Sequence, residues 1–450
     1  MNKEQKPMTS LNPRQVCLWI HRYTGLAMAA FLIIASITGT LLAFHHELDD
    51  VFNRKLVSID AQKSPLLSIA ELHDKVVANY PAQKFSSMPT SIKPDKAVVF
   101  SIDRSRGRGG NKPKPAFQEV YINPYTSDII GTRDKDAWAW NNTMWKVFWL
   151  HRDLLLGDIG KWVLGIVSLV WTINCFIGFY LTFPRAIKSS KNKPPSNKKR
   201  ASFFKRWLPA WKIRRKTNTF KLNYDLHHAF GLWLWVMLFV IAWSSVGFNL
   251  KSVYQPVMQA VVGLTPREGR PAKSEQNKPA EQQDRAERTA NSNTPVSNST
   301  NDAHISTQVV SKSNSIAYLS TQAEIAAKQN GVLVQQLLGI RWVEEDKQWQ
   351  MRFKTNKDIG EKGGASSITV DAATGRVERV NFGYQTTFGT KADQWLSTLH
   401  MGHIGQGWGH RLYQVFLAMI GLAVAVLSGT GVYLWWKGRQ QRLKALQKSK

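Results

Sequence analysis

Two segments of this sequence place a histidine at the start of a long apolar run and a glycine four positions later. His21 precedes Gly25 in the first segment, and His227 precedes Gly231 in the second. Imidazole is a frequent ligand of iron and other transition metals. A glycine one helical turn away lies on the same face and leaves room for a flat group against the backbone. The repeated pattern favours a porphyrin ligand, although a histidine at a membrane surface can also bond lipid headgroups or a neighbouring helix.

A second pair of histidines has a matching sequence context. His151 and His400 each follow a leucine, and they lie 25 and 26 residues after Thr126 and Thr374, respectively. Several glycines follow both histidines, which suits close approach to a flat cofactor or a broken helix start. The spacing predicts an internal repeat in which each copy consists of a helix, a soluble module and a second helix.

Four uncharged runs of at least 21 residues, 24–44, 162–183, 229–250 and 412–436, are each long enough to cross a bilayer. The segment 185–221 holds 14 Lys/Arg and no Asp/Glu, and the tail 437–450 holds six and none. The positive-inside rule therefore predicts that both segments and the N-terminus are cytoplasmic, in an inner membrane of bacterial type. The two long loops are then periplasmic.

This topology makes the two repeats parallel, related by a pseudo-twofold axis along the membrane normal. The axis pairs His21 with His227 near the cytoplasmic surface and His151 with His400 near the periplasmic surface. Because haem iron takes axial ligands from opposite faces, each pair is predicted to hold one haem between two helices. No catalytic residue is assigned beyond these four ligands.

The fold class is an α-helical membrane protein with four spans and two small α+β periplasmic modules. In each module a helical pattern, near 67–77 or 320–329, precedes alternating strands at 97–102 and 117–122, or around 349–353 and 368–370. The segment 264–315 lacks aromatic residues and predicts a disordered linker. The expected boundaries are 1–15 (N-terminus), 16–46 (span 1), 60–133 (module 1), 145–184 (span 2 with its extension), 185–221 (basic loop), 222–250 (span 3), 264–315 (linker), 316–385 (module 2), 396–436 (span 4 with its extension) and 437–450 (basic tail).

The remaining histidines are secondary candidates. His46 follows His21 by close to seven helical turns, so on one continuous helix it faces the same way and is a candidate periplasmic ligand or proton carrier. His228 is a candidate contact around the cofactor or lipid headgroups, or a ligand in place of His227. His403 and His410 are seven residues apart, on one face of span four, and are candidates to flank the periplasmic haem. His73 and His304 are assigned no role.

Composition excludes several other classes of function. The net charge is +29, but the basic residues concentrate beside the apolar runs, which favours membrane topology over nucleic-acid binding. The two cysteines, Cys17 and Cys175, have no CxxC spacing, so a disulfide, a structural zinc site or an iron-sulfur cluster is not expected. No GxGxxG, Walker or HExxH motif is present. The sequence therefore offers no recognisable nucleotide cofactor to reduce a bound porphyrin, and its electrons must come from a membrane quinol or a docked cytoplasmic reductase.

Taken together, these motifs resemble the PepSY-associated transmembrane family. The resemblance is carried by Leu150-His151-Arg152-Asp153, Leu399-His400-Met401-Gly402, the two His-x-x-x-Gly openings and the turns at 122–126 and 370–375. Within that family the chain is similar to inner-membrane siderophore-iron reductases, which implies four helices and two non-covalent b-type haems. Ser127 departs from the glycine usual in that turn, and His45-His46 is not part of the usual pattern.

The resemblance and the histidine pairs together predict transmembrane electron transfer to a periplasmic ferric chelate, in particular a ferric siderophore. Two alternatives remain open, a membrane-anchored PepSY protein that binds or regulates a protease, and a transporter. Matched histidines at both membrane faces are not needed by an anchor. Transport favours ionisable residues at mid-membrane, but the four apolar cores contain no Asp, Glu, Lys or Arg.

Overall fold

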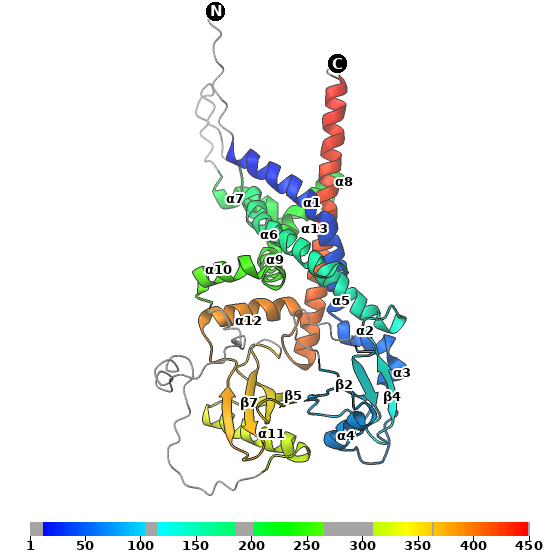
Figure 1. Ribbon diagram of the computed structural model, residues 1–450. Coiled ribbons are helices and arrows are strands. Elements are labelled where there is room, and N and C mark those ends of the chain that lie inside the picture. The colour runs from blue at the N-terminus through cyan, green and yellow to red at the C-terminus, as the bar shows by residue number, and fades with distance from the viewer. Residues whose placement is uncertain (1–11, 104–114, 186–200, 265–308, 362–363, 449–450) are drawn as a thin grey trace, which may run out of the picture.

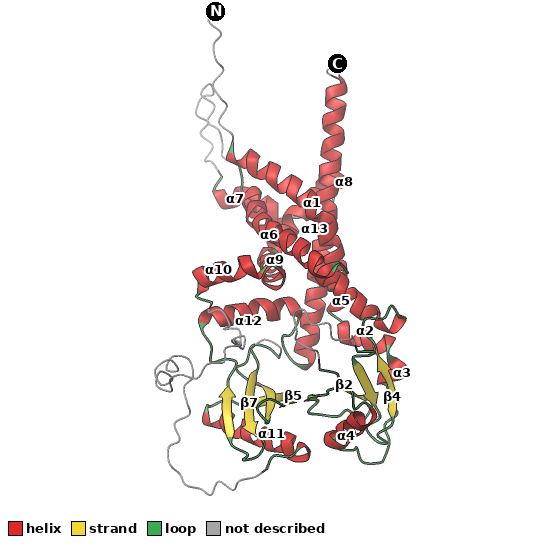
Figure 2. Ribbon diagram, viewed as in Figure 1, coloured by secondary structure: helices red, strands yellow, loops and turns green. Residues whose placement is uncertain are grey.

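The computed structural model describes residues 12–103, 115–185, 201–264, 309–361 and 364–448. It has two parts, a bundle of long helices and a group of strands and shorter helices at one end of that bundle (Figures 1 and 2). We call that end of the bundle the sheet end. The opposite end, where α1 begins and α13 ends, is called the terminal end.

Three helices, α1 (Pro13–Leu42), α6 (Gly157–Thr182) and α13 (Gly407–Lys448), are long and apolar enough to cross a membrane. A fourth candidate span is the pair α8 (Thr219–Trp233) and α9 (Trp235–Asn249). Helix α1 packs along α13 and α6, and α6 packs against α9. The four expected spans thus fall on three continuous helices and one bent pair, which gives three to four candidate membrane spans in a helical membrane protein.

The third span is not the single helix expected over 222–250. Helices α8 and α9 meet at Leu234 with a bend of 71°. No proline lies at this break, so the bend is fixed by packing. The Trp235 indole donates a hydrogen bond to the carbonyl of Cys175 at 2.9 Å and stacks on Phe239.

The first and last spans also differ from their expected bounds. Helix α1 ends at Leu42, and a separate helix α2 (His45–Phe52) follows. The extension of span four is a separate helix, α12 (Phe388–Met401), because Gly402 and Gly405 adopt positive φ of 77° and 75° and interrupt the chain before α13. At its other end α13 runs to Lys448, through the expected basic tail, whose Lys, Arg, Gln, Leu and Ala residues all favour helix.

The strands form two antiparallel sheets. One has the order β1-β5-β6-β7-β8, and the other has the order β2-β3-β4. Their bounds are β1 (Ser87–Met88), β2 (Val98–Ser101), β3 (Glu119–Ile122), β4 (Ile129–Arg133), β5 (Val334–Val343), β6 (Gln348–Thr355), β7 (Ser366–Asp371) and β8 (Val377–Asn381). Helix α11 (Lys312–Gln329) packs on the larger sheet, and α4 (Ile69–Asn79) packs against β3.

The two expected modules share one core. Strand β1 comes from the first module but pairs with β5 of the second, Ser87 opposite Arg341 and Met88 opposite Ile340. Side chains from both modules, among them Leu72 and Leu319, lie in one buried apolar cluster. The order of elements in each module was predictable, but their union into one domain was not.

The linker expected over 264–315 lies mostly outside the described residues. Its last residues were assigned wrongly, because α11 already begins at Lys312 and Val310 is buried. The Val310 carbonyl accepts a hydrogen bond from the Trp349 indole at 3.0 Å, and its amide donates to Ala372 at 2.8 Å. These contacts order a segment whose own composition is polar.

Five short helices complete the fold. They are α3 (Arg54–Val57), η1 (Trp140–Asn142), α7 (Phe203–Trp207), η2 (Leu208–Trp211) and α10 (Lys251–Val262). Helix α5 (Thr143–Asp153) leads from the smaller sheet into α6.

Candidate functional site

The structure brings the four principal histidines together as two pairs. His21 of α1 lies beside His227 of α8, with ring centres 6.2 Å apart and ring planes at 74°. His151 of α5 lies beside His400 of α12, with ring centres 6.3 Å apart and ring planes at 69°. In each pair the two histidines come from different helices.

The hydrogen bonds fix the tautomer of three of these imidazoles. His151 Nδ1 lies 2.9 Å from the Ala35 carbonyl, and His227 Nδ1 lies 3.1 Å from the Leu427 carbonyl. A carbonyl only accepts, so both Nδ1 atoms carry the proton. His400 Nδ1 lies 2.8 Å from the Ser244 hydroxyl, which already donates to the Val240 carbonyl and must accept here. The Nε2 atom of all three rings therefore keeps its lone pair for a metal.

His21 differs from the other three. Its Nδ1 atom is buried and has no hydrogen-bond partner, and the same holds for Oδ1 of Asn174 on α6. Asn174 is 3% exposed and lies within interaction range of the His21 ring. Its Nδ2 atom donates to the Thr24 hydroxyl at 2.7 Å. A small rotation would let Asn174 Oδ1 accept from His21 Nδ1 and hold this ring in the same tautomer as the others.

Glycines make room for three of the rings. A Cβ atom on Gly178 would lie 3.0 Å from His21 Cε1, and one on Gly431 would lie 3.4 Å from His227 Cε1. Both glycines open a Gly-x-Tyr-Leu sequence. A Cβ atom on Gly39 would lie 3.1 Å from His151 Cε1. Each ring therefore packs directly against the backbone of a neighbouring helix.

The contacts around the pairs repeat between the two halves of the chain. Thr38 lies 17 residues after His21, and Ser244 lies 17 residues after His227. The Thr38 hydroxyl is 3.1 Å from His151 Nδ1, as the Ser244 hydroxyl is 2.8 Å from His400 Nδ1. Thus α1, and likewise the bent pair α8 and α9, carries one histidine of the first pair together with a hydroxyl that contacts a histidine of the second.

The spacing of the rings fits a metal bound between them. With roughly 2.0–2.1 Å from metal to imidazole nitrogen and roughly 1.1 Å from that nitrogen to the ring centre, two axial imidazoles have centres roughly 6.2–6.4 Å apart. Among the residues that the structure describes, no group of three or more His, Cys, Asp or Glu could hold a metal ion. A metal at either pair would have two histidine ligands among the described residues, which leaves its other positions open to a cofactor such as a porphyrin or to water.

Space beside the first pair also suits a flat cofactor. Cβ atoms on Gly25 and Gly231, one turn from His21 and His227, would meet nothing within 4 Å. The residues present therefore fit a haem at this pair. At the second pair the Phe248 ring lies 5.2 Å from the His400 ring and forms part of the apolar wall.

The secondary candidates do not join either pair in the way expected. The argument for His46 required one helix from His21, but α1 ends at Leu42 and His46 stands in α2, with its ring 5.5 Å from that of His45. His45 in turn contacts the Trp145 ring at 5.6 Å. The helical phase that aligned His46 with His21 is lost at the break.

His403 and His410 do not share one helical face, which corrects the expectation for span four. His403 lies in the loop between α12 and α13, whereas His410 stands in the first turns of α13. The loop forms because Gly402 and Gly405 take positive φ. His410 Nδ1 lies 3.2 Å from the Ile404 carbonyl in this loop.

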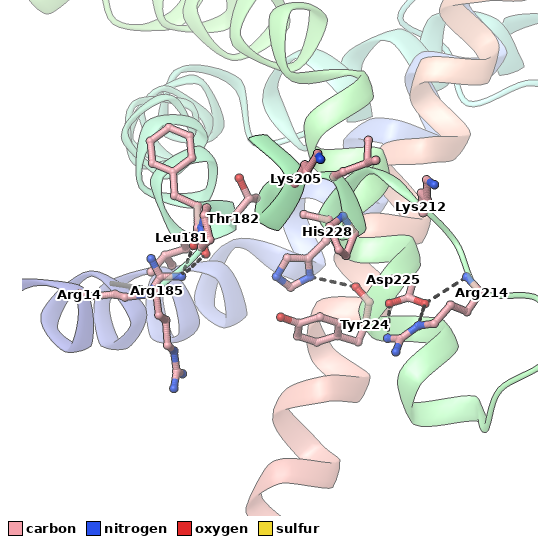
Figure 3. Close-up of a pocket in the computed structure, with 15 residues that line it drawn as sticks. Arg14, Leu181, Thr182, Arg185, Lys205, Lys212, Arg214, Tyr224, Asp225 and His228 are labelled. Atoms are coloured by element: carbon pink, nitrogen blue, oxygen red, sulfur yellow. Dashed lines mark hydrogen bonds and ion pairs between the residues drawn. The ribbon is translucent and has the colours of Figure 1, made fainter. Parts of the chain in front are cut away.

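His228 lines a cavity at the terminal end of the bundle (Figure 3). Its ring stacks on Tyr224 with centres 3.9 Å apart, and its Nδ1 donates to the Tyr224 carbonyl at 2.9 Å. The His228 ring remains 6.1 Å from the His227 ring. His228 thus lines this cavity, whereas His227 is the ring that pairs with His21.

Sequence reasoning assigned Asn174 no role at either histidine pair. Its position on α6, four residues before Gly178, was the available signal, because Gly178 faces the His21 ring. The hydroxyls of Thr38, Ser244 and Thr430 were missed, although small hydroxyl residues are common along such helices. Thr430 Oγ1 lies 3.2 Å from His227 Nδ1.

Residues 18–438 match the family described as the PepSY-associated TM region. The matched segment contains both histidine pairs and both sheets. No curated protein matches this chain.

Proposed function

Since this chain belongs to the PepSY-associated transmembrane family, we propose that it transfers electrons across a membrane through two b-type haems. The final acceptor is a ferric chelate, in particular a ferric siderophore, on the side of the sheets. Siderophore oxygens hold Fe(II) far less tightly than Fe(III), so one-electron reduction releases the iron for uptake.

The observation that carries this proposal is the presence of two histidine pairs, each with the ring spacing of two axial imidazoles. They also lie at two levels of the bundle. Thr38 contacts His151 and stands 17 residues after His21 on the same helix, which corresponds to roughly 25 Å along the axis. This separation approaches the thickness of the hydrocarbon core, roughly 30 Å, and supports one haem near each face.

The topology belongs to the same proposal. It has four spans, α1, α6, α8 with α9, and α13, arranged as two parallel repeats. The basic segments 185–221 and 437–450 support a cytoplasmic terminal end in a bacterial-type cell. The sheets are then periplasmic. The electron donor is a quinol or a cytoplasmic reductase at the terminal end.

In this mechanism the protein binds the haems, orients their histidine ligands and shields the electron path from water. His21 with His227 and His151 with His400 would hold one haem each, and a bound haem would supply the one-electron chemistry of its iron. The Nδ1 hydrogen bonds of His151, His227 and His400 fix the tautomer and strengthen the imidazoles as ligands. The apolar residues between the two levels keep water out of the path.

The test begins with an absorbance spectrum of the purified protein, oxidised and then reduced with dithionite. A pyridine haemochrome assay is expected to give about two haems per chain. A value near zero after expression with ample haem supply would refute the proposal and favour a membrane-anchored binding or regulatory protein. Reduction of a ferric chelate is then followed with a colorimetric Fe(II) chelator.

Alanine substitutions separate the two sites. His151→Ala and His400→Ala are expected to disturb one haem, and His21→Ala and His227→Ala the other, because distant sites with no shared ligand fail independently. A double substitution within one pair should lose no more haem than the worse single one. If His21→Ala and His151→Ala disturbed a common haem, the pairing would be wrong.

A further inference from the structure

A cavity of about 480 Å³ opens at the terminal end of the bundle, where the first turn of α1, the end of α6, α7 with η2, and α8 meet (Figure 3). Its lining includes five basic residues and one carboxylate, Asp225. A cavity of this size falls within the range of small-molecule sites, roughly 300–1,000 Å³. Neither histidine pair contributes a ligand residue to its lining.

Two of the five cations are already engaged by the protein. Arg14 donates through one terminal nitrogen to the carbonyls of Leu181 at 2.6 Å and Phe183 at 2.9 Å. Arg214 makes a bidentate pair with Asp225, both bonds 2.7 Å long. These contacts build the walls of the cavity and neutralise its one carboxylate.

The other three cations, Arg185, Lys205 and Lys212, have no ion pair to any described residue. The sequence that links α6 to α7, residues 186–200, contains no Asp or Glu that could neutralise them. Three cations without an ion pair among the described residues surround one cavity and create a positive potential, which favours an anion of matching charge.

The remaining wall is aromatic. Tyr224 and His228 stack on each other and line the cavity. Next to Lys205 and on the same short helices, Phe204 and Leu208 are 74% and 51% exposed. Apolar side chains exposed beside lysines are typical of a segment that lies in a membrane interface.

We propose that this cavity binds the phosphate group of an anionic ligand through Arg185, Lys205 and Lys212, with Tyr224 and His228 as its aromatic wall. The volume exceeds that of a bare phosphate, so the ligand carries the phosphate on a larger body. Two sources share this chemistry, an anionic phospholipid of the surrounding leaflet and a soluble phosphate compound. Basic pockets between transmembrane helices are known to hold anionic lipid headgroups.

The test uses the full-length protein in nanodiscs of phosphatidylcholine, alone or with phosphatidylglycerol, and measures its unfolding temperature. A second arm adds inorganic phosphate to phosphatidylcholine nanodiscs, against sodium chloride of equal ionic strength. The cavity variant is Arg185→Gln, Lys205→Gln, Lys212→Gln. Its matched control is Arg442→Gln, Lys444→Gln, Lys448→Gln, which removes the same charge from exposed positions of α13 at the same end.

We expect phosphatidylglycerol to raise the unfolding temperature of the wild type and of the control variant, and the cavity variant to lose at least half of this shift. A shift with inorganic phosphate that the cavity variant also loses would support the soluble source. An equal phosphatidylglycerol shift in both variants, or no shift with either anion, would overturn the proposal. If the triple variant misfolds, the single change Lys205→Gln is compared with Lys444→Gln. Haem content is not the readout, so the outcome is independent of the proposed electron transfer.

Discussion

Replacing Asn174 by leucine should change one haem site and leave the other intact. Leucine is the residue at the corresponding place of the second repeat, because Gly178-Phe-Tyr-Leu aligns with Gly431-Val-Tyr-Leu, which sets Asn174 against Leu427. The substitution removes the side-chain amide that lies within interaction range of the His21 ring. It also removes a polar group from an apolar core, so we expect the fold to be retained.

The expected shift in the redox potential of this haem follows from the role of hydrogen bonds to a ligating histidine. Loss of an outer-shell partner of a ligating histidine typically costs 10–100-fold in metal affinity, or about 1.4–2.7 kcal/mol. Once Asn174 Oδ1 rotates to accept from His21 Nδ1, this hydrogen bond makes the imidazole more basic and so favours the ferric state. If its whole effect falls on that state, the potential of the His21–His227 haem rises by roughly 60–120 mV, at 59 mV per tenfold change for one electron.

The assay is a spectroscopic redox titration of the purified protein, in which two one-electron waves are expected. Asn174→Leu should move one wave upward and leave the wave of the His151–His400 haem in place. A rescue variant adds Ile177→Thr, which copies Thr430, whose hydroxyl lies 3.2 Å from His227 Nδ1. The double variant should return the wave toward its original position.

Two outcomes would refute this reasoning. If neither wave moves while haem content stays at two, Asn174 does not orient His21. If both waves move by the same amount, the substitution acts through the whole bundle and not through one hydrogen bond. Rescue by Ile177→Thr, in contrast, would rule out a purely structural role for Asn174.

Three further predictions concern single positions. Gly25→Leu and Gly231→Leu should lower the haem content at the first pair without unfolding the helices, because their Cβ positions face open space. The control is Gly438→Leu, whose Cβ position is also open but lies near the end of α13. Unchanged haem content in all three variants would contradict a cofactor at these glycines. Ser127→Gly should stabilise the sheet domain by up to about 1 kcal/mol in denaturant unfolding, because Ser127 holds φ of 58°. Gly375→Ser, at the matching turn, should destabilise the same domain. Equal effects of the same sign would argue against backbone strain. Burial lowers the pKa of His73, whose Nε2 donates to the Phe85 carbonyl at 2.6 Å. The folded state therefore resists protonation of this ring, and the stability that neutral His73 contributes is complete above the ordinary pKa of 6.5 and is lost as pH falls below that value. His73→Gln should show a smaller drop in unfolding temperature between about pH 7.5 and pH 5.5 than the wild type, and an equal drop would assign the pH dependence to other groups.

The sequence determined the features that depend on composition and periodicity. Hydropathy identified the candidate membrane spans, since a run of some twenty uncharged residues is needed wherever a helix crosses a bilayer. The internal repeat singled out four histidines, and the structure places them side by side as His21 with His227 and His151 with His400. Repetition carries this information because the two histidines of each pair stand in matching sequence contexts in the two halves of the chain.

Only the tertiary structure decided the features that depend on contacts between distant segments. The break at Leu234 and the loop that removes His403 from α13 follow from packing and from positive φ at glycines, neither of which a helical period can register. The joining of β1 to β5 merged two modules into one domain. Asn174 faces His21 from 153 residues away. Hydrogen bonds and close packing act over a few ångströms, so such pairs are set by the fold and not by spacing along the chain.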